Sequence, residues 1–338
     1  MRRVALAIAL CLAAAAPAAP AFAWGAYGHR LVGQLATQAL PAEVPAFLRT
    51  PKAVDDIGEF ARELDRSKGS GRIHDHDRDS GHFVDLDEDG KVLGGPKFTP
   101  LPGTKADYET GLRAHDIDMW KAGYLQYSLI DGYQQLVKDF TYWRILTIVE
   151  KREKNATRLK YYRADRARRE ALLIRDLGVW AHYVGDASQP LHASIHFNGW
   201  GDYPNPKGYS QERSVHGVFE GEAVNANVTA ASVKARMKPF NDCNCPVDQR
   251  VTNFLTETAG HVEPLYVLWG DKAFGTEPNT RGAAFLNDRV AAGASELRDL
   301  VVLAWRESAN GVIGYRPTIS VKQVAQGGDP WKDLYGKD

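Results

Sequence analysis

Hydrophobic positions in this chain recur with the period of α-helices. One stripe near the N-terminus, at the i, i+3, i+4, i+7 spacing of a helix face, consists of Val32, Leu35, Ala36 and Ala39. A second stripe near the C-terminus consists of Leu286, Val290, Leu297, Val301 and Ala304. Period-2 runs of Val, Ile and Thr, which are typical of strands, are almost absent. The pattern predicts an all-α protein.

The stretch from Arg168 to Asp186 is the most informative of these helices. Its apolar stripe consists of Leu173, Leu177, Trp180 and Val184. At about 100° per residue, His182 and Asp186 fall on the opposite face, beside Gly178 and Val179. A helix that is apolar on most sides belongs inside a bundle. We therefore expect both polar side chains to be buried, where they need partners.

Segments rich in Gly, Pro, Asp or His separate the helices. They span residues 67–95, 198–214, 238–247 and 270–282. The sequence shows no internal repeat and no low-complexity linker, so we expect one mainly helical domain over residues 24–338, with long irregular loops that carry function.

The first 23 residues have the pattern of a secretory signal peptide. Arg2 and Arg3 precede an apolar run over residues 4–16, and Ala21 and Ala23 fit the small-x-small cleavage rule. The apolar run is too short to span a membrane. We expect cleavage before Trp24 and a secreted or periplasmic location.

Composition removes several classes of protein. The 338 residues include 42 Lys+Arg and 42 Asp+Glu, a balance that excludes a strongly basic nucleic-acid wrapper and an acidic disordered tail. Three cysteines exclude a disulfide-dense scaffold and a zinc module with four thiolate ligands. Cys243 and Cys245 are too close in sequence for an easy disulfide, although a secreted protein can still form one, so their pairing stays open.

Histidines and carboxylates at helical spacing point to metal chemistry. His182 and Asp186 are four residues apart on one helix, and His216 and Glu220 repeat this spacing, with His192 between the two pairs. Imidazole nitrogen with carboxylate oxygen, and no thiolate, is the ligand set of a hydrolytic zinc site. Either pair could instead be a hydrogen-bonded or exposed pair without a metal.

The expected mature N-terminus adds further ligands. Cleavage before Trp24 would place a free α-amine five residues from His29. Because the pKa of such an amine is about 7.7–8.0, a metal ion readily displaces its proton. The amine and carbonyl of Trp24 could then chelate one ion, with His29 alongside.

These residues stand in motifs that resemble those of the S1/P1-type zinc nucleases. The segment from Trp24 to His29 resembles the N-terminal WGxxGH, and the segment from His182 to His192 resembles HxxGDxxQPLH. Asp65 and the run from His82 to Asp85 resemble the intervening Asp and the HFxD segment. The bacterial zinc-dependent phospholipases C share the HxxGDxxQPLH core and the fold. The resemblance implies a helical domain of the phospholipase C/P1 nuclease type that holds three zinc ions.

The resemblance also implies a ligand set for each zinc ion. The first ion would take Asp65, His82, His182 and Asp186. The second would take the amine and carbonyl of Trp24, His29 and the bridging Asp186. The third would take His192, His216 and Glu220.

The substrate class stays open between two members of this superfamily. Phe219 before Glu220 is closer to the phospholipases, whereas the WGxxGH start and Lys68 are typical of the nucleases. The distance from His82 to His182 is longer than in either group, so residues 90–164 are expected to hold an insertion. We favour a secreted trinuclear-zinc phosphodiesterase that hydrolyses single-stranded DNA and RNA, a monomer with no obligate protein partner.

In this interpretation Asp65 and Lys68 are catalytic, and Phe83 and Lys68 bind substrate. An aromatic face such as that of Phe83 can stack any base. The alternatives are a phospholipase C, in which Trp200 and Tyr203 would form a choline cage or a lipid-docking patch, and a non-catalytic zinc-binding protein. Of the other candidates, His74 and His76 are expected in a solvated loop, and the segment from Asp85 to Gly90 in a turn.

Overall fold

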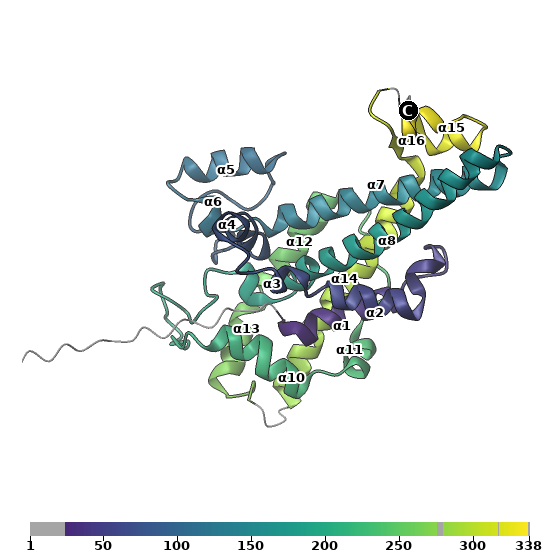
Figure 1. The fold of residues 1–338 in the computed structure, drawn as a ribbon. Helices are drawn as coiled ribbons and strands as arrows, with labels where there is room; N and C mark the ends of the chain where they lie inside the picture. Colours follow the sequence, from purple (N-terminus) through teal and green to yellow (C-terminus); the bar gives the residue numbers. More distant parts are fainter. Residues whose placement is uncertain (1–23, 276–279, 317, 337–338) are drawn as a thin grey trace, which may run out of the picture.

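The computed structural model describes residues 24–275, 280–316 and 318–336, and it is a single, mainly helical domain. The predicted signal peptide, residues 1–23, lies outside these residues. Five helices form the centre of the molecule (Figure 1): α1 (Gly25–Gln38), α2 (Pro51–Phe60), α7 (Leu125–Arg152), α8 (Ala156–Asp186) and α14 (Thr280–Glu307). The all-α prediction is confirmed.

The predicted hydrophobic stripes face the core, with one exception. The stripe of α14 and the stripe of α8 are buried throughout, and so are Val32, Leu35 and Ala36 of α1. Ala39 is exposed because α1 has already ended at Gln38, one residue earlier. The core is continuous from Trp24 at the start of α1 to Ala304 near the end of α14.

Shorter helices and turns surround this centre. The short α-helices are α3 (Glu63–Arg66), α4 (Arg72–Asp79), α5 (Lys105–Arg113), α6 (Met119–Ala122), α9 (Val215–Gly217), α10 (Val224–Asn227), α11 (Ala230–Arg236), α12 (Val247–Ala259), α13 (Val262–Gly270), α15 (Val321–Ala325) and α16 (Trp331–Tyr335). Single 3-10 turns lie at Ala46–Arg49, Ser80–His82, Pro190–Ala193 and Ser308–Asn310, and a π-helical turn at Val218–Ala223. Strands β1 (Val312–Ile313) and β2 (Ile319–Ser320) pair antiparallel.

Helices α7 and α8 form a long antiparallel hairpin that extends beyond the other helices, with α15 and α16 at its far end (Figure 1). Asn155 begins α8, because its side-chain oxygen accepts hydrogen bonds from the amides of Thr157 and Arg158. A second, smaller core at this end joins Ile145, Val149 and Tyr162 to residues of β1 and α15. Residues 90–164, the expected insertion, form α5, α6, α7 and the beginning of α8.

One local expectation is wrong. His74 and His76 lie on α4 rather than in a loop. Cys243 and Cys245, whose pairing the sequence leaves open, form a disulfide. Asn244 between them adopts a left-handed backbone conformation (φ 48°) that brings the two side chains together. The expected turn after Asp85 is present, since the side chain of Asp87 accepts hydrogen bonds from the amides of Asp89 and Lys91.

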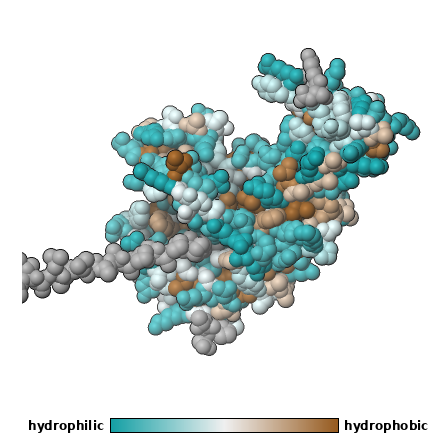
Figure 2. Space-filling view, in the orientation of Figure 1, coloured by the Kyte–Doolittle hydropathy of each residue, from teal (hydrophilic) through white to brown (hydrophobic). Residues whose placement is uncertain are grey.

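No helix within the described residues is long and apolar enough to cross a membrane. The face drawn in Figure 2 is mostly hydrophilic, with hydrophobic residues in small patches over its centre.

Candidate metal centre

The last turn of α8 carries the centre of the candidate site. His182 and Asp186 are fully buried, as the sequence pattern predicts. Gly185, between them on the chain, allows α1 to approach, because a Cβ at this position would lie 2.9 Å from Nδ1 of His29. The ring of His29 stacks on that of His182 with centroids 3.7 Å apart. Helices α1 and α8 thus place three polar side chains together inside the core.

A single carboxylate joins the imidazoles of this group. Oδ1 of Asp186 lies 3.4 Å from Nε2 of His29. Oδ2 lies 3.4 Å from Nε2 of His182 and 3.0 Å from Nδ1 of His82, which the 3-10 turn Ser80–His82 supplies. Asp186 therefore has the position of a bridging ligand between two adjacent groups.

Asp65 completes the second of these groups. Its Oδ1 lies 3.8 Å from Nε2 of His182, and its side chain is only 9% exposed. Nζ of Lys68, one helical turn further along the chain, lies 2.7 Å from the same oxygen. The structure thus brings Asp65 to the site from α3, where it forms an ion pair with Lys68.

The third group lies beside the first two and consists of His192, His216 and Glu220. Oε1 of Glu220 is 3.0 Å from Nε2 of His192 and 2.7 Å from Nε2 of His216, and the two nitrogens are 3.2 Å apart. Gln189 also donates a hydrogen bond to this oxygen. His216 precedes the π-helical turn that contains Glu220, so a local change in helix geometry accompanies the pair.

Three groups of buried side chains can therefore each hold a metal ion: His29, His182 and Asp186; Asp65, His82 and His182; and His192, His216 and Glu220. A tetrahedral zinc ion with ligands at about 2.0–2.1 Å separates neighbouring ligand atoms by about 3.3–3.4 Å. The separations given above, from 2.7 to 3.8 Å, lie around this value, and all ligand atoms of a group lie within 4.8 Å of one another.

Hydrogen bonds at the rear of two rings determine which nitrogen faces inward. Nδ1 of His192 donates to the carbonyl of His82 at 2.6 Å, and Nδ1 of His182 donates to the carbonyl of Ala61 at 2.8 Å. Since a carbonyl can only accept, a neutral ring in either position has its lone pair on Nε2. These lone pairs point at the carboxylate oxygens of Glu220 and Asp186. Such an arrangement is favourable only with a cation between the atoms, and a divalent metal ion fits it.

Two carboxylate oxygens of the centre support the same conclusion. Oδ1 of Asp186 and Oε2 of Glu220 are buried and accept no hydrogen bond from the described residues. A buried carboxylate oxygen without a donor costs free energy unless a cation binds it.

Burial favours neutral imidazoles at His182 and His82. Burial lowers the pKa of His182 to about 4, and burial together with His182 lowers the pKa of His82 well below its usual value. Burial and the neighbouring Asp65 raise the pKa of Asp186 well above its usual value. Burial also raises the pKa of Glu220, but His216 and His192 outweigh this effect and bring it to about 2. A metal ion would compensate the buried charges.

Trp24 is fixed beside this centre by its side chain. The indole is fully buried, and its Nε1 donates to the carbonyl of Gly185 at 2.8 Å and to Oγ of Ser188 at 3.0 Å. The backbone of Trp24 adopts a left-handed conformation (φ 41°) at the start of α1. Its carbonyl accepts from the amide of Gly28 and retains one lone pair. Trp24 is thus anchored to the same turn of α8 that carries Asp186.

The predicted aromatic substrate residues differ in exposure. Phe83 is half-buried next to His82 and packs over Gly123, where a Cβ would lie 2.7 Å from its ring. Trp200 is buried, stacked on His196 at 3.7 Å, and so it has no exposed face for a ligand. Tyr203 is 40% exposed and meets the ring of His196 edge-on.

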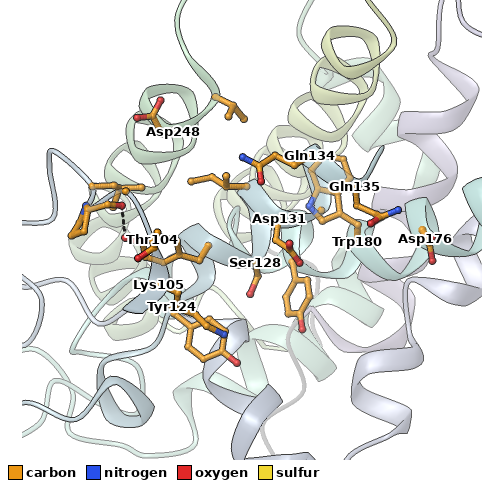
Figure 3. A pocket seen from close by; sticks show the side chains of 18 of the residues that line it. Thr104, Lys105, Tyr124, Ser128, Asp131, Gln134, Gln135, Asp176, Trp180 and Asp248 are labelled. Carbon is orange, nitrogen blue, oxygen red and sulfur yellow. Dashed lines mark hydrogen bonds between the residues drawn. The ribbon is translucent and has the colours of Figure 1, made fainter. Parts of the chain in front are cut away.

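A cavity of about 810 Å³ lies behind the metal centre. Tyr183 lines it and also contacts the ring of His82, with centroids 5.4 Å apart. Figure 3 shows Lys105 and Tyr124 on one side of the cavity and Trp180 and Asp176 of α8 on another. Its charged lining residues are Lys105, Asp131, Asp176 and Asp248. The excess of carboxylates suits a neutral or cationic group better than a phosphate.

Sequence reasoning missed the residues that support the ligands. Gln189 donates to Glu220, and Nε of Arg289 on α14 donates to the carbonyl of Ser188 at 3.0 Å, just beyond Asp186. Gln189 stands in the motif that ends at His192, so the motif could have indicated that Gln189 supports a ligand. Nothing in the sequence marks Arg289, which lies about 100 residues away along the chain.

Searches against models of known protein families and against curated proteins find no match to this chain.

Proposed function

We propose that this chain is a secreted phosphodiesterase with three zinc ions, of the type that the S1/P1 nucleases represent, and that it hydrolyses single-stranded DNA and RNA. The observation that carries the proposal is the convergence of three buried His/Asp/Glu groups. Two of them share His182 and are joined by the two oxygens of Asp186, and the third lies beside them. An isolated structural zinc site needs only one such group. Adjacent groups joined by one carboxylate are typical of multi-metal hydrolytic centres.

Zinc ions bound in these groups would lower the pKa of a coordinated water to about 7 and polarise a phosphoryl oxygen. The side chains of the site have separate tasks. Asp65, at the edge of the centre, is placed to accept a proton, and its position beside His182 supports this role. Lys68 holds Asp65 by an ion pair, and Asp65 and Asp186 together outweigh the effect of burial and raise the pKa of Lys68. A positive charge here would stabilise a phosphorane-like transition state.

The preference for single strands rests on Phe83. Its half-buried ring lies next to His82, where an unpaired base could stack at a gain of about 1–3 kcal/mol. A base in a duplex must leave its own stack to reach such a face. Near-neutral net charge is no obstacle, because the metal ions supply local positive charge that a count of Lys and Arg misses.

A phospholipase C is the second candidate, and the cavity behind His82 favours it. Three carboxylates with Tyr124, Trp180 and Tyr183 in its lining suit a quaternary ammonium headgroup. The earlier candidates for such a cage fit less well, since Trp200 is buried.

One enzyme preparation assayed on three substrates tests the proposal. We expect cleavage of a single-stranded oligonucleotide, slower cleavage of duplex DNA, no release of phosphocholine from phosphatidylcholine vesicles, and loss of all activity with a chelator. Release of phosphocholine with an intact oligonucleotide would establish the phospholipase instead. Inactivity on every phosphodiester would leave a zinc-binding protein without catalysis.

The variant Asp65→Asn separates catalysis from metal binding. Because His82, His182 and Asp186 still surround the second position, it should retain most of the zinc. It should hydrolyse bis(p-nitrophenyl) phosphate about 10²–10⁴-fold more slowly, the usual contribution of a general base. Asp77→Asn is the matched control, because this carboxylate is 74% exposed on the nearby helix α4. Equal rates for the Asp65→Asn variant and the unchanged protein would remove Asp65 from the mechanism.

A further inference from the structure

The outer half of the α7–α8 hairpin has a strong excess of positive charge. From Arg144 to Asp176 the chain has eleven Lys and Arg against five Asp and Glu, a net charge of +6. Because the whole chain is neutral, the remaining residues sum to −6. The molecule is therefore divided into a basic arm and an acidic body.

The exposed cations of the arm form one face of α8. Lys160, Arg163, Arg168 and Arg175 are exposed, and at about 100° per residue they lie within one side of the helix. The carboxylates of this helix, Asp165, Glu170 and Asp176, are partly buried outside that face. Arg163 pairs with Glu150 at 3.4 Å and Arg175 with Asp176 at 2.7 Å, whereas Lys160 and Arg168 form no ion pair within the described residues. This face thus presents positive charge to solvent.

An aromatic side chain lies within the basic face. Tyr161 is 54% exposed, and its ring is supported by Trp331 and Tyr335 of α16, each with a centroid distance of 5.8 Å. The second core holds this end of the arm in place. A rigid, exposed ring among cations is suited to stacking with an unpaired base.

The same face continues to the metal centre. Tyr161, Arg168, Arg175 and His182 recur at intervals of seven residues, which keeps them on one side of α8 within about 60°. With a rise of about 1.5 Å per residue, Arg175, Arg168 and Tyr161 lie about 10, 21 and 32 Å from His182 along the helix. Past Arg175 the surface leads to Val179 and Tyr183, which line the cavity beside His82. Because this cavity has an excess of carboxylates, a neutral base suits it and the phosphates lie outside it.

We propose that this face of α8, with Lys160, Arg163, Arg168, Arg175 and Tyr161, is a docking surface for the part of a single-stranded nucleic acid that lies outside the catalytic centre. The inference rests on the proposed nuclease function for the identity of the polyanion. Phosphates contact the cations, which releases counterions, and one base stacks on Tyr161. At about 3.4 Å per nucleotide, a strand of about ten nucleotides covers the distance from His182 to Tyr161, whereas one of four nucleotides reaches only Arg175.

Binding to metal-free protein tests the surface separately from catalysis. The chelator-treated protein is titrated against fluorescent single strands of about 20 and about four nucleotides over a range of salt concentrations. The triple variant Lys160→Gln, Arg168→Gln, Arg175→Gln should bind the long strand about 100-fold more weakly near 0.1 M salt. It should also lower the slope of log K against log salt by about 2, because single strands contribute about 0.7 per phosphate. Binding of the short strand, which reaches only Arg175, should weaken by about fivefold at most.

The matched control removes the same charge elsewhere. Lys97, Lys121 and Lys234 are exposed on three other segments, and their replacement by Gln should leave the affinity for the long strand within about threefold. The variant Tyr161→Ala should bind the long strand with about tenfold lower affinity. Hydrolysis of bis(p-nitrophenyl) phosphate by the zinc-loaded arm variants should be unchanged.

The outcomes are distinguishable. Equal affinity of the arm and control variants for the long strand would overturn the docking surface, even if the enzyme cleaves DNA. Arm-dependent binding to vesicles with anionic lipid, without binding to single strands, would overturn it in favour of a membrane surface. Absence of cleavage with intact arm-dependent binding would overturn the proposed nuclease function and support the surface.

Discussion

His192 shows most clearly how a single side chain defines the candidate site. Its Nδ1 donates to the carbonyl of His82, so the lone pair of Nε2 faces the carboxylate of Glu220 and the ring of His216. The same hydrogen bond joins the third metal group to the segment that supplies the second. The ring of His192 is thus positioned by the backbone of a neighbouring candidate ligand.

The variant Glu220→Gln tests the third group. Gln preserves the volume but removes the negative charge, so we expect the zinc content to fall by about one ion per chain, with the other two retained. Glu222→Gln is the matched control, because Glu222 is an exposed carboxylate of the same turn. Elemental analysis measures the zinc content of both variants. An unchanged zinc content in the Glu220→Gln protein would exclude this residue as a ligand.

Trp24 allows a test at the expected N-terminus. If its α-amine is a ligand, protein that begins at Trp24 should bind one zinc ion more than protein with a residue left before it. The buried indole holds the backbone in the same place in both forms, which isolates the effect of the amine. Zinc content and phosphodiesterase activity are measured for both, with a C-terminal tag as control. Full activity of the extended protein would contradict the assignment.

At the scale of elements, α8 organises the molecule, since one end carries metal ligands and the other the basic arm. Its glycines permit the close contacts. Gly178 faces α2, where a Cβ would lie 2.5 Å from Cβ of Phe60, and Gly185 faces His29. The pattern of apolar positions predicts this helix and the burial of His182 and Asp186. It does not predict what packs against them, because that depends on α1 and α2.

The variant Gly185→Ala should weaken the first metal group. The added methyl group would lie 2.9 Å from Nδ1 of His29, and such overpacking costs about 1–3 kcal/mol. We expect a lower Tm and loss of the ion that His29 and Asp186 share. Gly111→Ala in α5 is the control, because a Cβ there has no neighbour within 4 Å and Ala favours helix by about 1 kcal/mol. If both variants have the same Tm and the same zinc content, the close approach of His29 to Gly185 does not limit the side chain at position 185.

At the scale of the whole molecule, contacts between distant segments hold the site. Arg289 of α14 donates to the carbonyl of Ser188, beyond the end of α8, and forms a two-pronged ion pair with Glu257 of α12. Sequence analysis could indicate candidate ligands by two routes: helical spacing for His182 with Asp186 and His216 with Glu220, and the resemblance to known motifs for Asp65 and His82. It could not predict Arg289, the Cys243–Cys245 disulfide or the helix at His74, since these depend on packing or on local backbone conformation.

Glu257 predicts how stability depends on pH. Burial raises its pKa, but His261 and Arg289 outweigh this and bring it to about 2. Because the folded value lies below the unfolded value of 4.5, the stabilisation is present above about pH 4.5 and is lost as the pH falls towards 2.

The variant Glu257→Gln should therefore lower the Tm near pH 7 and have no effect near pH 2. The side chain is 48% exposed, so solvent screening limits the loss to about 1 kcal/mol. Thermal unfolding across this pH range is compared with Glu263→Gln, an exposed pair with Lys207 that should change little at any pH. A constant difference in Tm at all pH values would show that the charge of Glu257 is not responsible.

The central claim is that three metal ions occupy the three buried groups. Diffraction at the zinc absorption edge, from crystals of protein that begins at Trp24 and was purified without chelator, tests it most directly. We predict three anomalous peaks: one between His29 and Asp186, one among Asp65, His82 and His182, and one among His192, His216 and Glu220. A single peak, or peaks outside these groups, would contradict the account.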